Sequence, residues 1–127
     1  PPHEGEFLRV GGDLSQGRTA AAEDFARRSG AVVVLKGPGT VVAGPDGRCR
    51  VNTTGNCGMA KGGSGDVLSG VVLALLGLGI DAFDACCCAV WLHGRAGDLA
   101  AQEKGQWGMT PTDLLERLPQ ALREVTE

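Results

Sequence analysis

The residues best suited to chemistry in this sequence lie in a glycine-rich segment, residues 55–68. Its key part reads, in order, Gly62, Gly63, Ser64, Gly65 and Asp66. A helix N-terminus presents unpaired N–H groups and a positive partial charge, and glycine lets a phosphate approach them closely. The segment therefore predicts an anion hole for a transferring phosphoryl group, with Asp66 accepting a hydroxyl proton. An ordinary helix start with a glycine-rich entry is the alternative interpretation.

A second candidate segment follows the apolar, β-branched run at residues 31–35. It consists of Lys36, Gly37, Pro38, Gly39 and Thr40. A continuous apolar run is typical of a strand covered on both faces, and ligands of α/β sheets gather at the carboxyl ends of strands. The segment is expected to wrap the ribose or phosphate of a nucleotide. The alternative is a tight turn between strands with a solvated lysine.

A third cluster lies near the start of the sequence, where His3, Glu4 and Glu6 fall within four residues. An imidazole could hydrogen-bond a polar substrate, and a carboxylate could bind Mg²⁺ through water. A solvated group of charges is the alternative interpretation, because terminal residues are often poorly ordered.

The elements that must position these residues follow from hydrophobic periodicity. Strands are expected at residues 31–35, 40–43 and 48–52, the last two as a hairpin about the turn at residues 44–47. Gly30 should end the first helix, and Thr110 should cap the last helix with Pro111 at its first position. Helices are expected at residues 18–28, 65–78, 82–102 and 111–125.

This order of elements predicts one three-layer α/β domain over residues 1–127. We expect a parallel sheet of two or three strands, which leaves an edge or a face open. Further strands should therefore come from sequence outside this chain or from a partner.

Composition narrows the possible partners. The chain has 127 residues and a formal net charge of −3, so neither nucleic acid nor an anionic membrane is expected as a partner. The five cysteines lack the spacing of a disulfide framework or a zinc site, which favours a reducing, cytoplasmic environment. We expect His93 and residues 86–88, three adjacent cysteines, to pack in the core. Trp91 and Trp107 are expected in the core or at an interface.

In this order, the segments resemble the ribokinase-like superfamily, and within it the NAD(P)H-hydrate dehydratases. The resemblance runs from Pro2 to about Leu122. It rests on His3-x-x-Glu6, on residues 35–40, on residues 55–68 and on the run from Leu92 through His93, Gly94, Ala96 and Gly97 to Asp98. Related vitamin kinases tend to carry Asn at the position of His3, which favours the dehydratase.

Two positions depart from the family pattern. Cys57 stands where proline is usual, and we expect it only to loosen the loop. Lys61 stands where threonine is usual, beside the predicted anion hole. Its ammonium could add a charge near the phosphates or point into solvent, and the sequence leaves both open.

The resemblance implies the C-terminal portion of a three-layer α/β/α ribokinase-like sandwich. The implied activity is ADP- or ATP-dependent dehydration of hydrated NADH or NADPH, a repair reaction in which the hydrate hydroxyl is phosphorylated and phosphate is eliminated. The donor nucleotide stays open. By resemblance, Asp66 is catalytic and contacts substrate, and residues 62–65 form the anion hole. Residues 36–40 and Gly65 bind the nucleotide, His3 contacts the hydrate, and Glu6 holds Mg²⁺ through water.

Two other function classes remain compatible with the sequence. A ribokinase-like vitamin kinase would keep the phosphate on its product. A non-catalytic nucleotide-binding or assembly fragment would turn over nothing. Family members hold roughly this much chain again before the His-x-x-Glu motif, so we expect the 127-residue chain alone to be inactive. Its open apolar surface is expected to drive self-association with even-numbered symmetry.

Overall fold

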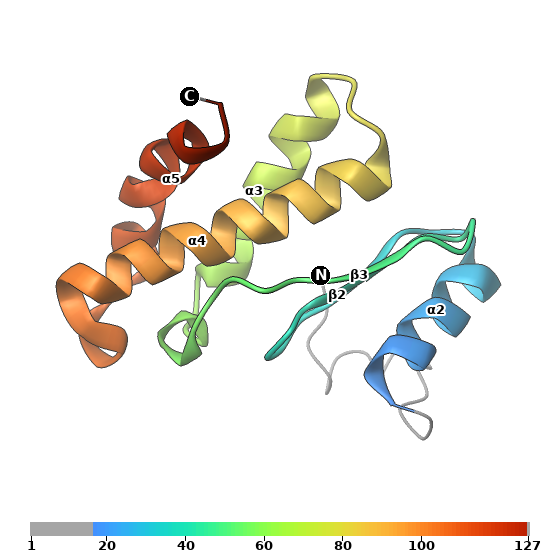
Figure 1. The fold of residues 1–127 in the computed structure, drawn as a ribbon, viewed down its shortest axis with the longest axis horizontal. Helices are drawn as coiled ribbons and strands as arrows, with labels where there is room; N and C mark the ends of the chain where they lie inside the picture. Colours follow the sequence, from blue (N-terminus) through green and yellow to red (C-terminus); the bar gives the residue numbers. More distant parts are fainter. Residues whose placement is uncertain (1–16, 127) are drawn as a thin grey trace.

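The computed structural model describes residues 17–126. A helix, three short strands, a 3-10 turn and three helices follow one another along the chain (Figure 1). They are α2 (Arg18–Ser29), β1 (Val33–Leu35), β2 (Val41–Ala43), β3 (Cys49–Val51), η1 (Cys57–Met59), α3 (Ser64–Gly77), α4 (Ala82–Gly108) and α5 (Pro111–Thr126). His3, Glu4 and Glu6 lie outside the described residues.

The three described strands form one antiparallel sheet in the order β1-β2-β3. Val34 pairs with Val42, which in turn pairs with Arg50. The β2–β3 hairpin is confirmed, but the prediction of a parallel sheet is wrong for these strands. Their connections are too short for the crossover that parallel neighbours require. A fully apolar strand indicates cover on both faces without revealing the direction of its neighbour.

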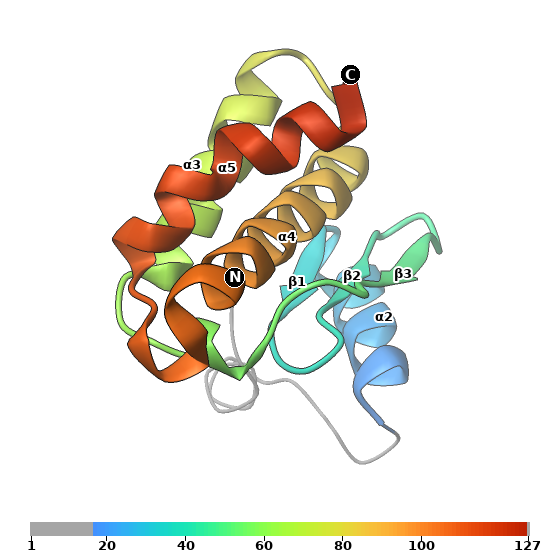
Figure 2. The same cartoon turned by 60° about the vertical axis from the view of Figure 1, so that its left-hand side comes forward.

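Successive side chains of a strand point to opposite faces of the sheet, and the two faces pack into two separate cores. Val33 and Leu35 on β1 pack with Ala22 and Ala26 of α2. Val34, on the opposite face, packs with residues of α3 and α4 such as Leu68, Phe83 and Val90. Both views show α2 on one side of the strands and α4 with α3 on the other (Figures 1 and 2). The three-layer α/β/α prediction is thereby confirmed.

A third core joins α4 to α5. Leu114 and Ala121 of α5 are fully buried with Leu92 and Leu99 of α4. The buried cysteines Cys86 and Cys87 face the sheet instead, and all five cysteines are free thiols. The packing roles predicted for His93, for Trp91 and for the cysteine run are therefore confirmed.

The start of α5 has the predicted cap. The Asp113 backbone N–H donates to Thr110 Oγ1 at 3.2 Å, and the Thr110 N–H donates to Asp113 Oδ2 at 2.9 Å. This reciprocal pair satisfies two N–H groups at the helix start. The Thr110 N–H bond also lowers the pKa of the Asp113 carboxyl.

Helix α4 extends beyond the predicted end at residue 102, to Gly108. Gly105, at φ 75° and ψ 159°, breaks the helical geometry within this last stretch. The residues directly after Gln102 are polar and do not continue the apolar pattern of the helix, which explains why the pattern placed the end too early. Trp107 is 97% exposed, so of its two predicted positions, the core or an interface, the core is excluded and the interface stays a prediction.

One side of α3 and the loop after it remains open. Leu73 and Leu78 are 71% and 77% exposed, and Leu76 and Ile80 are also exposed. Leu115, Leu122 and Val125 are exposed on α5. A surface this apolar is unusual for a monomer and indicates a contact face. Within residues 17–126, none of the helices combines the length and apolarity needed to cross a membrane.

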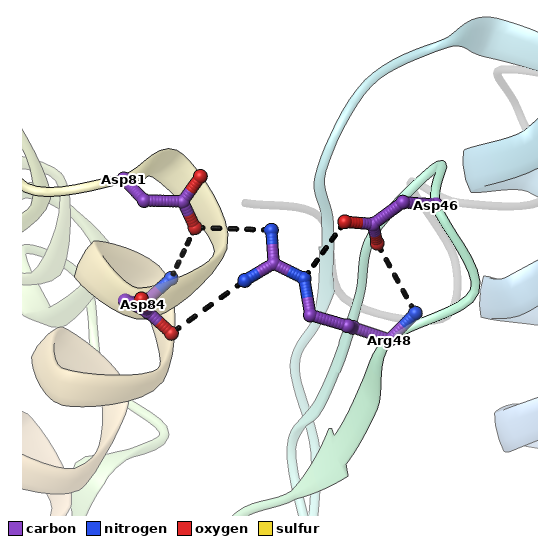
Figure 3. Close-up of polar contacts among 4 residues, drawn as sticks. All are labelled: Asp46, Arg48, Asp81 and Asp84. Carbon is purple, nitrogen blue, oxygen red and sulfur yellow. Dashed lines mark hydrogen bonds and ion pairs between the residues drawn. The ribbon is translucent and has the colours of Figure 1, made fainter.

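Arg48 ties the β2–β3 turn to the start of α4 (Figure 3). Its Nε donates to Asp46 Oδ2 at 2.8 Å, and its guanidinium pairs with Asp81 at 3.1 Å and Asp84 at 3.7 Å. The guanidinium also lies 4.6 Å from the centre of the Phe83 ring. The Arg48 backbone N–H, with the side chain adding to it, lowers the pKa of Asp46. Because Asp81 also caps α4 by accepting from the Asp84 N–H, one cation serves both the turn and the helix start.

We predict that Arg48→Ala lowers the thermal unfolding midpoint, because the turn loses its link to α4. The difference from wild type should shrink in 1 M salt, where the Debye length is only about 3 Å. Arg48→Lys is the matched control, since it keeps the charge but loses the planar fork that reaches three carboxylates. An Arg48→Ala midpoint equal to wild type at low salt would show that the link contributes nothing.

Candidate active site

The loop that carries the predicted anion hole, residues 52–63, is fastened to the backbone of α4. Asn52 Nδ2 donates to the Val90 carbonyl at 3.1 Å. Thr54 Oγ1 donates to the Trp91 carbonyl at 2.9 Å. These bonds use second lone pairs of helical carbonyls, so the loop is held without breaking the helix. We call residues 52–63 the site loop.

Asp98 fastens the next part of the site loop. Its two carboxylate oxygens accept from the Gly55 N–H at 3.1 Å and from Asn56 Nδ2 at 3.0 Å. Asn56 Oδ1 in turn accepts from the Gly58 N–H at 2.9 Å and caps η1. One carboxylate on α4 thus orients the residues that lead into the anion hole.

Close approach of the loop to α4 depends on two glycines of the helix. A Cβ at Gly94 would lie 2.7 Å from the carbonyl carbon of Thr54. A Cβ at Gly97 would lie 2.8 Å from Cγ of Met59. The first neighbour is backbone and cannot yield as a flexible side chain can. Gly94 is therefore required for the observed position of the site loop.

Lys61, beside the predicted anion hole, is bound to backbone carbonyls. Its Nζ donates to the Trp107 carbonyl at 3.0 Å and also to the Met109 carbonyl. The solvated orientation is wrong, because the ammonium binds carbonyls at the C-terminal end of α4. A cation is favoured there by the helix dipole. Cys57, at the other departure from the family pattern, is exposed at the start of η1.

The predicted anion-hole residues lie at the start of α3. Gly63 is the N-cap residue, and its carbonyl accepts from the Val67 N–H at 3.2 Å. Gly62 is exposed, Ser64 is buried, and Asp66 lies exposed in the first helical turn. The N-terminus of α3 therefore presents its first N–H groups beside an accessible carboxylate, as the predicted chemistry requires.

The structure brings the two predicted segments together. Lys36, at the end of β1, reaches the start of α3, and its Nζ lies 3.1 Å from where a Cβ at Gly65 would stand. An ammonium group and a helix N-terminus thus meet at one point. Both attract a phosphate, and a glycine at position 65 keeps the space between them open.

Arg18, which sequence analysis missed, holds the turn at residues 36–40. Its Nη1 donates to the Pro38 carbonyl at 2.7 Å and to the Gly39 carbonyl at 3.2 Å. Its Nη2 donates to the Leu35 carbonyl at 3.2 Å. The sequence around Arg18 does not indicate this role, because the carbonyls that Arg18 binds belong to a turn distant in the chain.

The turn also has internal support. Thr40 Oγ1 donates to the Gly37 carbonyl at 3.2 Å. A Cβ at Gly37 would lie 2.6 Å from Nη2 of Arg18, so a side chain there would displace the guanidinium from its observed position. With its carbonyls directed toward Arg18, the turn is a preformed segment rather than a solvated connection.

His93 lies behind the start of α3. Its Nε2 donates to the Ser64 carbonyl at 2.9 Å, and the ring is 8% exposed. Burial lowers the pKa of His93, and the charge of Lys36 acts in the same direction against the opposing effect of the Ser64 carbonyl. The imidazole is therefore neutral near pH 7.

Among the residues that the structure describes, no predicted site residue lines the cavity of about 520 Å³ between the β2–β3 side of the sheet and α4. Asn52, Thr53, Cys88 and Trp91 are among its lining residues. The described residues also contain no group of three His, Cys, Asp or Glu side chains that could hold a metal ion. The chemistry-bearing residues instead meet on an open surface at the start of α3.

Comparisons with known proteins agree with this geometry. A family model described as NAD(P)H-hydrate dehydratase matches residues 1–120. The bifunctional NAD(P)H-hydrate repair enzyme of Thermofilum pendens is 48% identical over 99% of this chain, which spans 25% of that protein. The ADP-dependent (S)-NAD(P)H-hydrate dehydratase of Neisseria meningitidis is 44% identical over 82% of this chain, which spans 36% of that protein.

A solved structure shares the fold. The ADP/ATP-dependent NAD(P)H-hydrate dehydratase of Bacillus subtilis, co-crystallised with ATP and Mg²⁺, superposes with a TM-score of 0.91. It is 38% identical, and the match covers 97% of this chain and 46% of the solved chain. The chain thus spans about a quarter of the Thermofilum relative and just under half of the solved dehydratase.

We predict that Gly94→Ala destabilises the chain by about 1–3 kcal/mol, since the new methyl group forces the site loop away from α4. Gly70→Ala is the matched control, because Gly70 lies within α3 with nothing within 4 Å of a Cβ. The control should be neutral or gain up to about 1 kcal/mol from helix propensity. Urea unfolding of both variants measures the difference, and equal stabilities would refute the close-contact argument.

Proposed function

We propose, from the premise that the chain belongs to the NAD(P)H-hydrate dehydratase family, that it forms the C-terminal half of a domain that dehydrates hydrated NADH or NADPH. ADP or ATP is the phosphoryl donor. The observation that carries the proposal is the meeting of Lys36 with Gly65 at the start of α3, directly beside Asp66. This arrangement supplies a phosphate site and a proton acceptor at one place.

The proposed reaction first turns a poor leaving group into a good one. Asp66 accepts the proton of the hydrate hydroxyl while the hydroxyl oxygen attacks the terminal phosphoryl group of the nucleotide. The rest of the nucleotide leaves as AMP when ADP is the donor, or as ADP when ATP is the donor. The lone pair of the ring nitrogen then expels phosphate. Loss of a proton from the neighbouring carbon restores the dihydronicotinamide.

The protein contributes position and charge to this reaction. The backbone N–H groups at the start of α3 and the ammonium of Lys36 stabilise charge on the transferring phosphoryl. Residues 36–40, held by Arg18, place the nucleotide. Because these groups are preformed, little reorganisation is needed when the nucleotide binds.

The proposals for the phosphoryl donor and for Mg²⁺ are supported by similar proteins. The Neisseria protein is described as ADP-dependent, and the Bacillus structure was obtained with ATP and Mg²⁺. Glu6 as a water-mediated Mg²⁺ ligand and His3 as a hydrate contact stay proposals, since both lie outside the described residues. The free thiols support a reducing compartment, and we propose the cytoplasm.

We predict that Asp66→Asn in the complete dehydratase domain lowers turnover more than about a hundredfold, because the proton acceptor is lost. Nucleotide affinity should stay nearly unchanged. Gly65→Ala is the counterpart, since its methyl group meets Lys36 and should weaken nucleotide binding. Recovery of reduced-nicotinamide absorbance measures turnover, and titration calorimetry measures affinity. Asp66→Asn activity within fivefold of wild type would remove Asp66 from the mechanism, and a phosphorylated final product would indicate a kinase.

We predict that the isolated 127-residue chain binds AMP or ADP weakly, self-associates with even-numbered symmetry and does not dehydrate. The chain spans under half of the solved dehydratase, and Leu73 and Leu78 leave an apolar face to cover. Incubation with hydrated NADH, Mg²⁺ and either ADP or ATP tests the activity. Light scattering tests the assembly, with Leu73→Lys as the variant that should shift it toward monomer. Robust turnover by this chain alone would overturn the half-domain proposal.

A further inference from the structure

The two buried polar side chains among residues 17–126 belong to Ser64 and His93. They come from different helices, 29 positions apart in sequence, and are joined by the bond from His93 Nε2 to the Ser64 carbonyl. A buried imidazole is costly unless it is hydrogen-bonded. The bond therefore gives the buried ring the hydrogen-bond partner that it needs. That partner is the carbonyl of Ser64, the first residue of α3.

The bond fixes the chemical state of His93. A carbonyl oxygen only accepts, so Nε2 carries the proton in this arrangement. Burial and the nearby charge of Lys36 lower the pKa of the ring and keep it neutral near pH 7. At the start of α3, Lys36 therefore supplies a positive charge beside Gly65, and His93 acts as a neutral hydrogen-bond donor to Ser64.

The geometry of the peptide transmits this restraint to the anion hole. The Ser64 carbonyl and the Gly65 N–H belong to one planar trans peptide, so they point in opposite directions. A donor that holds the carbonyl also holds the direction of the N–H. That N–H belongs to the residue beside which Lys36 Nζ lies.

We propose that His93 is a positioning residue that aims the Gly65 N–H at the phosphoryl group to be transferred. It acts through Ser64 and touches neither nucleotide nor hydrate. The inference rests on the proposed function, since it assigns the Gly65 N–H to the terminal phosphoryl. His93 thus acts only on the terminal phosphoryl group, whereas the turn at residues 36–40 holds the rest of the nucleotide.

The test compares ADP with AMP, which lacks the terminal phosphoryl. In titrations of the 127-residue chain, His93→Leu should weaken ADP binding about tenfold, the size expected when one aligned charge-assisted contact is lost. AMP binding should change less than about twofold. His93→Gln should restore most of the ADP affinity, because an amide can donate to the Ser64 carbonyl.

Leu99→Ala is the matched control, since it removes buried volume from the same helix in the core that joins α4 to α5. It should weaken ADP and AMP to the same extent. Equal losses of ADP and AMP in His93→Leu, no loss of either, or failure of His93→Gln to restore ADP binding would overturn the proposal.

Nitrogen-15 NMR of the wild-type chain gives an independent readout. Nε2 of His93 should be protonated and Nδ1 should not, and the Gly65 amide should shift in His93→Leu without nucleotide. An Nδ1-protonated ring or an unmoved Gly65 amide would overturn the assignment, even if His93→Leu folds poorly. If the wild-type chain binds neither nucleotide, the proposed function fails for this chain while the NMR measurements still decide the role of His93.

Discussion

The contact between the site loop and α4 is the constraint on which the rest of the site depends. Gly94 lets the backbone at Thr54 approach the helix, and Asp98 then accepts hydrogen bonds from Gly55 and Asn56. His93 of the same helix binds the carbonyl of Ser64, the residue that follows the site loop. One face of one helix therefore positions the chain on both sides of η1. A site built on a rigid element in this way needs little ordering when a ligand binds.

The arrangement of cations is compatible with the proposed phosphate site in a chain with net charge −3. Arg18, Arg48 and Lys61 are all directed toward carbonyls or carboxylates of the protein. Lys36 is placed beside the start of α3, where the helix dipole adds to its charge. The proposed phosphate site therefore relies on one ammonium and aligned N–H groups rather than on an overall basic surface.

Several features were predictable because they follow from local chemistry. The order of helices and strands, the hairpin about residues 44–47, the stop at Gly30 and the Thr110 cap depend on neighbours in sequence. The meeting of Lys36 with Gly65 was also foreseeable in outline, because ligand-binding groups gather at strand ends and helix starts.

The features that sequence analysis missed depend on partners distant in the chain. Arg18 binds carbonyls about twenty residues away, and Lys61 binds carbonyls more than forty residues away. Strand direction likewise depends on which neighbour pairs with β1, and the apolar pattern of residues 31–35 is the same for either direction. In each case the residue type was compatible with several partners. Tertiary structure selected one.

Within the described chain, His93 holds Ser64 and Lys36 lies beside Gly65. Arg18 holds the turn at residues 36–40, and Asp98 holds the start of the site loop. The proposed phosphate-binding residues are therefore held by contacts from other described residues. The exposed face of α3 is different, because Leu73 and Leu78 gain nothing from the residues described. Since α3 carries the proposed anion hole at one end and this open face along its length, whatever covers the face also restrains the helix that bears the candidate site. Covering the face and completing the substrate pocket are thus linked through one helix, which joins the assembly of the domain to its chemistry.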